Sequence, residues 1–467
     1  MTEHSMTIAG EPVAGAESFP VIDPAQGAPF TSVPECSRAE LERAMDAAQR
    51  AFRTWRKHEA ERRTLLLAAS NVIGMNSEQL ARLLVREQGK PLAQARREVL
   101  GASLVFHGVS KLDLSPQTTR DDGKSKISIH RRPYGVVGAI TPWNFPILIA
   151  ATKIAPALLA GNTVVLKPSP FTPLTTLALG SLLRQVLPPG VLNVVSGGDE
   201  LGRLIAEHPA VRKVTFTGSV ATGKKVAASA AADLKRVTLE LGGNDPAIVL
   251  GDVDPERIAK PLFWGAFANS GQVCTAIKRV YVEERVFDAV VAAVSALARS
   301  VKVGSGLEPD VELGPINNAP QQRRVTELVE DARSRGAKIR AGGGPRSGPG
   351  YFFEPTVVTD VSDEARLVAE EQFGPALPIL PFSRLDDALE RANATHFGLS
   401  ASVWTSDSAR GAAIAAELEC GTAWVNQHIA LSPHAPFGGA KQSGIGYENG
   451  QWGLEGFYQL HVINARP

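Results

Sequence analysis

Cys274 is the first residue whose type and setting suggest chemistry. It lies in the small, polar segment NSGQVCT (residues 269–275), which is typical of a loop or a helix start rather than of a packed core. A lone cysteine is more often a small, buried apolar side chain. The serine and glycine of this segment favour an exposed thiol instead, and a helix start would lower its pKa. Cys274 is therefore a candidate nucleophile, whereas Cys36 and Cys420 are interpreted as structural.

Glu240 and Asn144 are candidates for proton transfer and for oxyanion stabilisation. Glu240 ends the apolar run 237–239 and precedes two glycines. We expect it at the carboxyl edge of a sheet, where partial desolvation raises a carboxylate pKa toward that of a general base; the alternative is a solvated charge. Asn144 lies in TPWNFP (141–146), whose prolines and aromatics predict a rigid turn. Its amide could face a developing oxyanion or bond its own backbone.

A glycine-rich segment, FTGSVATG (216–223), predicts a strand followed by a helix start. This arrangement binds phosphate through backbone N–H groups at the helix N-terminus. The segment is not the GxGxxG fingerprint, so alone it is a weak sign of a dinucleotide site. No GxxxxGK[ST] motif occurs, which disfavours phosphoryl transfer.

The elements that must position these residues alternate between strand and helix. Short apolar strands, each followed by a helix, predict a parallel, doubly wound sheet that binds ligands at the carboxyl ends of its strands. The expected strands are 136–140, 164–166, 191–195, 214–216 and 236–240, and the expected helices are 147–159, 174–186, 201–207 and 224–231. A second α/β section follows, to about residue 440.

The opening third is expected to be an all-helical layer. Ser37 and Glu40 form a capping box, and start signals at Asn76 and Pro91 predict two further helices. Residues 125–130 and 456–462 fit neither α/β section and are predicted to be strands, the first in a hairpin. Exposed strands of this kind invite pairing with another subunit, although they could also cap the chain's own sheet.

The composition limits which classes of protein the chain can belong to. At about 150 residues per domain, the 467 residues predict two or three domains. A net charge of +1 gives no reason to expect nucleic acid or an anionic membrane as partner. The three cysteines are too far apart for a CxxC metal or redox motif, so no metal is expected and a cytoplasmic location is the default. The first thirty residues lack a signal-peptide pattern, and the uncharged run 133–152 contains prolines and glycines that argue against a membrane span.

Taken together and in this order, these segments closely resemble the aldehyde dehydrogenase superfamily, of the NAD(P)-dependent, non-acylating type. The resemblance covers essentially the whole chain and rests on TPWNFP (141–146), KPSP (167–170), FTGS (216–219), LELGG (239–243), NSGQVC (269–274), EEQFGP (370–375) and PFGGAKQSG (436–444). It implies a cysteine-based oxidation of an aldehyde to its acid. Cys274 would attack the carbonyl, Asn144 and the Cys274 N–H would hold the oxyanion, and Glu240 would activate the water that hydrolyses the thioester.

The resemblance also implies cofactor contacts. Lys167 and Ser169 would contact the adenosine ribose, and Glu371 and Phe373 the nicotinamide ribose and ring. The remaining residues implied in cofactor binding are Thr141, Pro142, Trp143, Gly218, Ser219, Gly223 and Leu241, those of the segment 218–223 lying beside the pyrophosphate.

The fold implied is two Rossmann-like α/β domains with a small β arm for oligomerisation. The expected boundaries are 1–117 and 136–242 for the cofactor domain, 243–442 for the catalytic domain, and 118–135 and 443–467 for the arm. A homodimer or homotetramer is expected.

One departure from the family pattern concerns the cofactor. Pro170 stands where many NAD-preferring members have a glutamate, so NAD and NADP both stay open, with a preference for NAD. The residues implied in the aldehyde tunnel are mostly apolar, which favours an uncharged aliphatic or aromatic aldehyde: Ile149, Val273, Thr275, Leu431 and Phe437. The alternatives are a coenzyme A-acylating enzyme, against which Glu240 argues, and a catalytically silent binding or structural member.

Overall fold

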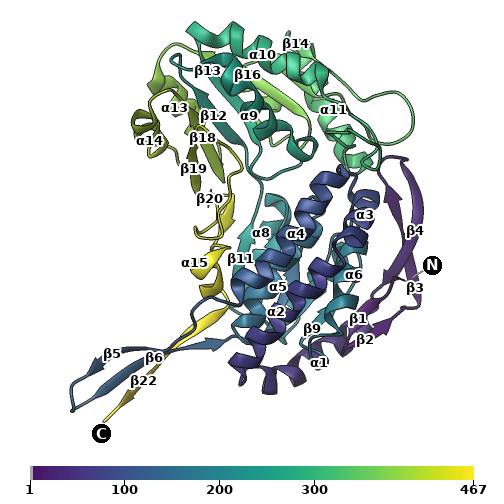
Figure 1. The fold of residues 1–467 in the computed structure, drawn as a ribbon, viewed down its shortest axis with the longest axis vertical. Coiled ribbons are helices and arrows are strands. Elements are labelled where there is room, and N and C mark those ends of the chain that lie inside the picture. The colour runs from purple at the N-terminus through teal and green to yellow at the C-terminus, as the bar shows by residue number, and fades with distance from the viewer. Residues whose placement is uncertain (1–3, 467) are drawn as a thin grey trace.

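The chain folds into two lobes and a projecting arm in the computed structural model, which describes residues 4–466 (Figure 1). An eight-stranded sheet organises the first lobe and a seven-stranded sheet the second. Adjacent strands of the first sheet are, in order, β2 (Glu11–Val13), β1 (Met6–Ile8), β9 (Leu192–Val194), β8 (Thr163–Lys167), β7 (Val136–Ile140), β10 (Val211–Thr217), β11 (Arg236–Glu240) and β21 (Gly444–Ile445).

The central five strands of this sheet, β9 to β11, are all parallel, which confirms the predicted doubly wound sheet. At the edges, β1 and β21 run antiparallel to these five strands, and β2 pairs antiparallel with β1. The helices of this lobe are α1 (Arg38–Trp55), α2 (Glu59–Met75), α3 (Ser77–Gln88), α4 (Leu92–Val109), α5 (Pro146–Leu159), α6 (Leu174–Leu183), α7 (Asp199–Glu207) and α8 (Val220–Ala231).

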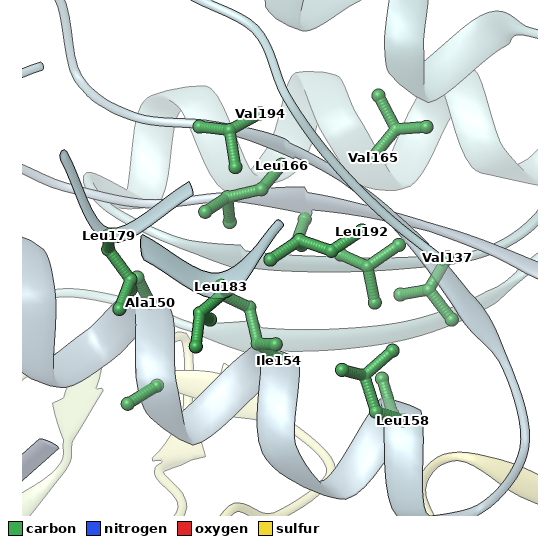
Figure 2. Close-up of a cluster of buried hydrophobic side chains, with 14 of the residues drawn as sticks. Val137, Ala150, Ile154, Leu158, Val165, Leu166, Leu179, Leu183, Leu192 and Val194 are labelled. Atoms are coloured by element: carbon green, nitrogen blue, oxygen red, sulfur yellow. The ribbon is translucent and has the colours of Figure 1, made fainter. Parts of the chain in front are cut away.

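The core of the first lobe lies where α5 and α6 pack on strands β7, β8 and β9. Figure 2 shows the aliphatic side chains that fill this layer, among them Ile154 and Leu158 of α5 and Leu183 of α6. Each is fully buried. Burial of such aliphatic side chains is worth about 1.5–3 kcal/mol apiece, so this layer holds the carboxyl ends of the strands in fixed positions.

The second lobe repeats the parallel arrangement. Adjacent strands of its sheet are β14 (Lys338–Ala341), β15 (Thr356–Thr359), β16 (Ala376–Phe382), β13 (Ile277–Glu283), β12 (Asp245–Val249), β18 (Ser400–Trp404) and β19 (Thr422–Val425), with only β14 antiparallel. Its helices are α9 (Pro255–Phe267), the short 3-10 helices η1 (Ala268–Gly271) and η2 (Glu284–Val286), α10 (Phe287–Ser300), α11 (Ala319–Ser334), α12 (Arg366–Ala369), α13 (Leu385–Asn393) and α14 (Ser408–Ala415).

The expectation of an all-helical opening third is wrong in two respects. Four strands precede α1: β1 and β2 extend the first sheet, and β3 (Glu17–Asp23) and β4 (Ala28–Glu35) form a hairpin. Four helices then follow rather than three, because α2 was not expected. Its first residue follows His58, which makes no side-chain capping bond, so the usual start signal is absent there. The capping box of Ser37 and Glu40 at α1 is confirmed.

The arm is a separate three-stranded sheet that projects beyond the first lobe (Figure 1). It consists of β5 (Gln117–Asp121), β6 (Lys126–Pro133) and β22 (Tyr458–Ala465), with β6 paired antiparallel to both neighbours. The expected hairpin and C-terminal strand are therefore confirmed, and the alternative that they cap one of the large sheets is wrong. The other small elements are β17 (Phe397–Gly398), which pairs with β20 (Ala440–Lys441), and α15 (Gly450–Glu455).

Among residues 4–466, no helix is long and apolar enough to cross a membrane. The uncharged run 133–152 instead forms β7 and the first half of α5, both mostly buried in the first lobe.

Candidate active site

The order of strands in the first sheet identifies where a ligand should bind. From β7 the chain moves outward to β8 and β9, then returns to β10 on the other side of β7 and continues to β11. Ligands of such sheets bind at this reversal point, outside the carboxyl ends of the strands. The loop after β7 is the predicted rigid turn 141–146, and the loop after β10 is the glycine-rich segment ending in α8.

Cys274 comes to the same place from the second lobe. The loop between η1 and β13 carries it at the amino end of β13, which lies beside the amino end of β12. The carboxyl edge of the first sheet therefore faces the amino edge of the second. Both edges line one cavity of about 500 Å³, bounded by Trp143, Asn144 and Gly218 on one side and by Cys274 and Glu371 on the other.

The loop before Cys274 has an unusual backbone. Asn269, Ser270 and Gly271 all have positive φ, at 51°, 56° and 72°. A side chain at Gly271 would also lie 2.5 Å from the carbonyl carbon of Gly374. Left-handed conformations of non-glycine residues are costly and cluster at functional sites. The strain is held by hydrogen bonds, including Ser270 Oγ to the Gly314 carbonyl (2.7 Å).

The Cys274 thiol is partly exposed and lines the cavity; of the two settings expected from the sequence, the structure has the loop and not the helix start. Cys274 follows η1 in a turn, so no helix N-terminus lowers its pKa. Burial, together with the carboxylates of Glu240, Asp245 and Glu371, instead raises the pKa of this thiol to about 12. Only the Lys278 ammonium lowers it, so attack by the thiolate requires a base or a change in this charge balance.

Asn144 is buried beside the Cys274 loop. Its side-chain Nδ2 donates to the Gln272 carbonyl at 3.0 Å. The alternative of a turn asparagine bonded to its own backbone therefore does not hold. An amide N–H directed at the cysteine loop is suited to bind an oxyanion formed on the substrate.

Glu240 lies at the carboxyl end of β11, between Thr217 of β10 and Gly444 of β21. Its carboxylate is buried, and neither oxygen has a hydrogen-bond partner among the described residues. Burial raises its pKa well above the ordinary value, the Glu448 charge raises it further, and Lys153 lowers it. The solvated-charge alternative is wrong, and the expected position and pKa direction are confirmed. A carboxyl of raised pKa is suited to accept a proton from water near neutral pH.

Of the residues implied in cofactor binding, most line the cavity: Pro142, Trp143, Gly218, Ser219, Leu241, Glu371 and Phe373. The Ser219 side chain caps α8 by accepting from the Thr222 N–H, which confirms the expected strand and helix start. Thr217 also lines this cavity, and its buried Oγ1 has no partner among the described residues. The N-terminus of α8 and the Thr217 hydroxyl could both donate hydrogen bonds to a pyrophosphate bound in this cavity.

Glu371 and Phe373 lie on the second lobe's side of the cavity. Glu371 Oε1 accepts from the Gly243 N–H at 3.2 Å and lies 3.9 Å from Lys278 Nζ. A Cβ on Gly242 would lie 3.0 Å from the Glu371 carboxyl carbon, so a larger residue there would displace this carboxylate. The Phe373 ring meets the Trp143 ring edge to face at 5.1 Å, joining the two sides of the cavity. The Glu371 carboxylate could accept hydrogen bonds from the two hydroxyls of a ribose, because an ionised carboxylate offers two acceptor oxygens.

Four implied residues do not line this cavity: Thr141, Lys167, Ser169 and Gly223. Lys167 is buried at the end of β8, where its Nζ donates to the Pro168 carbonyl. Burial lowers its pKa to about 8, opposed by the charges of Asp199 and Glu35. Gly223 lies in the first turn of α8 against the Leu241 side chain, so it has a packing role.

Three buried lysines contact the site; sequence reasoning did not identify Lys90 or Lys153, and it placed Lys278 only near Cys274 along the chain. Lys153 pairs with Glu448 at 2.7 Å next to Glu240, Lys278 donates to the carbonyls of Val273 and Cys274, and Lys90 contacts Asn144. A detectable signal existed for Lys153, which is the single charge in the apolar helix α5. The other two lie in polar segments where a lysine is unremarkable by pattern.

Comparison with known proteins places the chain in one family. A sequence profile of the aldehyde dehydrogenase family matches residues 12–463. The chain is 39% identical over 456 residues to the 3-sulfolactaldehyde dehydrogenase of Pseudomonas putida, covering 96% of this chain and 93% of that protein. The NAD+ complex of a Bacillus cereus aldehyde dehydrogenase is 36% identical, with a TM-score of 0.97 and coverage of 99% and 96%. An NADP-dependent E. coli enzyme is 35% identical, also at 0.97, with coverage of 100% and 98%.

The chain therefore belongs to the aldehyde dehydrogenase family. It is an NAD(P)-dependent aldehyde dehydrogenase with the fold of that family: two largely parallel α/β sheets and small antiparallel sheets.

Proposed function

We propose that this enzyme oxidises an uncharged aldehyde to the free acid by a hydrolytic route through Cys274. After the Cys274 thiol loses its proton to water, its sulfur bonds to the aldehyde carbon as the C=O π bond opens, and the new oxyanion accepts hydrogen bonds from Asn144 Nδ2 and the Cys274 N–H. A nicotinamide held by Glu371 and Phe373 would supply the acceptor for the hydride that leaves this carbon, and loss of these two electrons would convert the bound substrate to a thioester on Cys274. Glu240 accepts a proton from water, whose oxygen attacks the thioester and releases the acid and the thiol.

The observation that carries the hydrolytic route is the state of Glu240. Its carboxylate is buried without a partner among the described residues, and its pKa is raised. An unpaired buried carboxyl costs free energy of about 1–3 kcal/mol or more, which purely structural residues avoid. A coenzyme A thiol would capture the acyl group without such a base, so this site favours water over coenzyme A.

An uncharged substrate is favoured because the two cations near Cys274 in sequence already donate to backbone carbonyls. The Lys278 ammonium donates to three backbone carbonyls, and the Arg279 guanidinium donates to Asn244, Arg391 and Ala392 carbonyls. Neither is free to bind a second anionic group of a substrate. Of the five residues implied in the aldehyde tunnel, Val273 and Thr275 are buried on either side of Cys274, whereas Leu431 is 49% exposed. None of the five lines the cavity that contains Cys274, so the apolar tunnel stays a prediction.

We propose NAD as the preferred cofactor. Pro170 supplies no carboxylate for the adenosine ribose, but the charges of Asp199 and Glu35 both act on Lys167. Negative charge at this position disfavours the 2′-phosphate of NADP and suits the free hydroxyls of NAD. The relatives themselves differ in cofactor, since the Bacillus cereus structure is an NAD+ complex and the E. coli enzyme is NADP-dependent.

The domain division at residues 117, 135, 242 and 442 stays a prediction, as does self-association through the arm. Leu460 and Val462 on β22 are 67% and 57% exposed. Apolar side chains on an edge strand favour burial against a second copy. Sedimentation of the purified chain at equilibrium should give a dimer or tetramer mass; a monomer at micromolar concentration would contradict this. A cytoplasmic location fits the three free cysteines at 36, 274 and 420.

The test of the function is reduced-cofactor absorbance across aliphatic, aromatic and carboxylated aldehydes, with NAD and NADP in parallel. Each reaction is run with and without coenzyme A, and the product is identified by mass spectrometry. The proposal expects free acid without coenzyme A, with aliphatic or aromatic aldehydes ahead of carboxylated ones. A requirement for coenzyme A would refute the hydrolytic route, and no reduction with any pair would support the silent alternative.

A further inference from the structure

A buried ion pair lies directly behind Asn144. Lys90 is in the turn between α3 and α4, and its ammonium pairs with the carboxylate of Glu98 on α4. The side chains of Lys90 and Glu98 are 0% and 1% exposed. Replacing such pairs by apolar side chains is often neutral or stabilising, so burial of this pair is weak support for a role in stability.

The pair contacts the loop of Asn144 at successive residues. Lys90 Nζ donates to the Asn144 carbonyl at 2.8 Å and lies 3.9 Å above the centre of the Phe145 ring. Glu98 Oε1 accepts from the N–H groups of Ile147 and Leu148, at 3.2 and 3.4 Å, in the first turn of α5. The backbone on both sides of Pro146, which has no N–H, is therefore held by one charge pair.

Three hydrogen bonds hold Asn144, two on its backbone carbonyl and one from its side chain. Its carbonyl accepts from Lys90 and from Asn269 Nδ2 (3.2 Å), and its own Nδ2 donates to the Gln272 carbonyl. The Lys90 bond thus fixes the backbone of the residue whose amide faces the cysteine loop. A displacement of about 1 Å in a catalytic group can reduce a rate by about a hundredfold.

We propose that the Lys90–Glu98 pair is a positioning device that directs the Asn144 amide at the oxyanion formed on Cys274. The inference rests on the oxyanion role given to Asn144 under the proposed function. Neither charged group touches the substrate, so both act through Asn144. The helical layer of the first lobe, through the α3–α4 turn, thereby contributes to a reaction that takes place on the second lobe.

The test uses two reactions of Cys274 that need no cofactor. In the first, the thiolate attacks p-nitrophenyl acetate, an acyl–sulfur bond forms, and nitrophenolate leaves; an oxyanion develops in this step. In the second, iodoacetamide alkylates the sulfur and iodide leaves, with no oxyanion. Both rates are measured for the full chain, together with the free energy of unfolding in urea.

Lys90→Met should slow acylation about 10- to 100-fold and change alkylation by no more than about twofold. The matched control is Lys235→Met, which removes another buried ammonium that donates to backbone carbonyls, those of Ala206 and His208, far from Cys274 along the sheet. It should change neither rate. If Lys90→Met slowed alkylation as much as acylation, the pair would be a general support of the cysteine loop, and the proposal would be overturned.

A double-mutant cycle with Asn144→Ala separates positioning from general structure. In the Asn144→Ala background, Lys90→Met should change acylation by no more than about twofold, because the amide it positions is gone. An equal loss in both backgrounds would overturn the proposal. If Asn144→Ala alone left acylation at the full rate, the oxyanion role itself would fail, an outcome distinct from the failure of the positioning role.

Lys90→Met leaves Glu98 unpaired and buried, so it is accompanied by the double variant Lys90→Met with Glu98→Met. Removing both charges avoids an unpaired buried carboxylate. The double variant should fold and show the same selective loss of acylation. A double variant that acylates at the wild-type rate would overturn the proposal.

Discussion

Replacing Gly271 by alanine perturbs the strained loop that carries Cys274, and its cost follows from two separate terms. The backbone φ of 72° is left-handed, which costs an alanine about 1–2 kcal/mol. The added methyl would also lie 2.5 Å from the Gly374 carbonyl carbon and 3.1 Å from the Pro375 nitrogen, both backbone atoms. Overpacking of this kind costs about 1–3 kcal/mol more. We therefore expect Gly271→Ala to lower the free energy of unfolding by about 2–5 kcal/mol.

Gly336→Ala is the matched control. Gly336 has a φ of 93°, and a methyl group there would meet no atom within 4 Å. This variant should lose only the backbone term, about 1–2 kcal/mol. The assay is urea unfolding of both variants, with the rate of Cys274 alkylation by iodoacetamide measured on the folded proteins. Gly271→Ala should also change the alkylation rate, whereas Gly336→Ala should not. Equal losses of stability, or an unchanged alkylation rate in folded Gly271→Ala, would refute the reasoning.

Three further outcomes follow from the same structure. Glu448→Gln removes a negative charge that raises the pKa of Glu240, so the pKa of Glu240 should fall. The acid limb of the pH profile of thioester hydrolysis should then move to lower pH. Stopped-flow rates measured across pH test this, and a shift of the acid limb to higher pH would contradict it. Pro170→Glu places a carboxylate beside Lys167 and should raise the kcat/KM ratio of NAD to NADP by about 10-fold or more; an unchanged ratio would assign the choice to other residues. Cys36→Ser and Cys420→Ser should each retain steady-state turnover, since these thiols donate to backbone carbonyls away from the cavity, and loss of turnover in either would show a second essential thiol.

The parallel sheet was predictable from sequence because its signals are local. The strands β7 and β11 begin and end at the expected residues, since each is a short apolar run bounded by a glycine or a charge. The position of Glu240 followed directly, because the last residue of a parallel strand lies at the carboxyl edge. The strands before Ser37 were missed, because β1 and β2 have only three residues each and the partly exposed β3 and β4 lack a clean apolar alternation.

The charge environment of the site was not predictable in the same way. The flanking serine and glycine correctly favoured an exposed loop for Cys274, but its pKa depends on burial and on Glu240, Asp245, Glu371 and Lys278, most of them distant in sequence. Likewise Lys90 meets Asn144 across 54 residues of chain. Such contacts depend on how the two lobes and the helical layer pack, and no periodicity in one segment encodes them.

The central claim is that Cys274 forms the acyl intermediate and Glu240 hydrolyses it. The most direct measurement is mass spectrometry of Glu240→Gln after acid quenching of a reaction with aldehyde and cofactor. The account predicts one stoichiometric burst of reduced cofactor, slow turnover afterwards, and an acyl adduct on the peptide that contains Cys274. Steady-state turnover at the wild-type rate, or a burst with no adduct on Cys274, would contradict it.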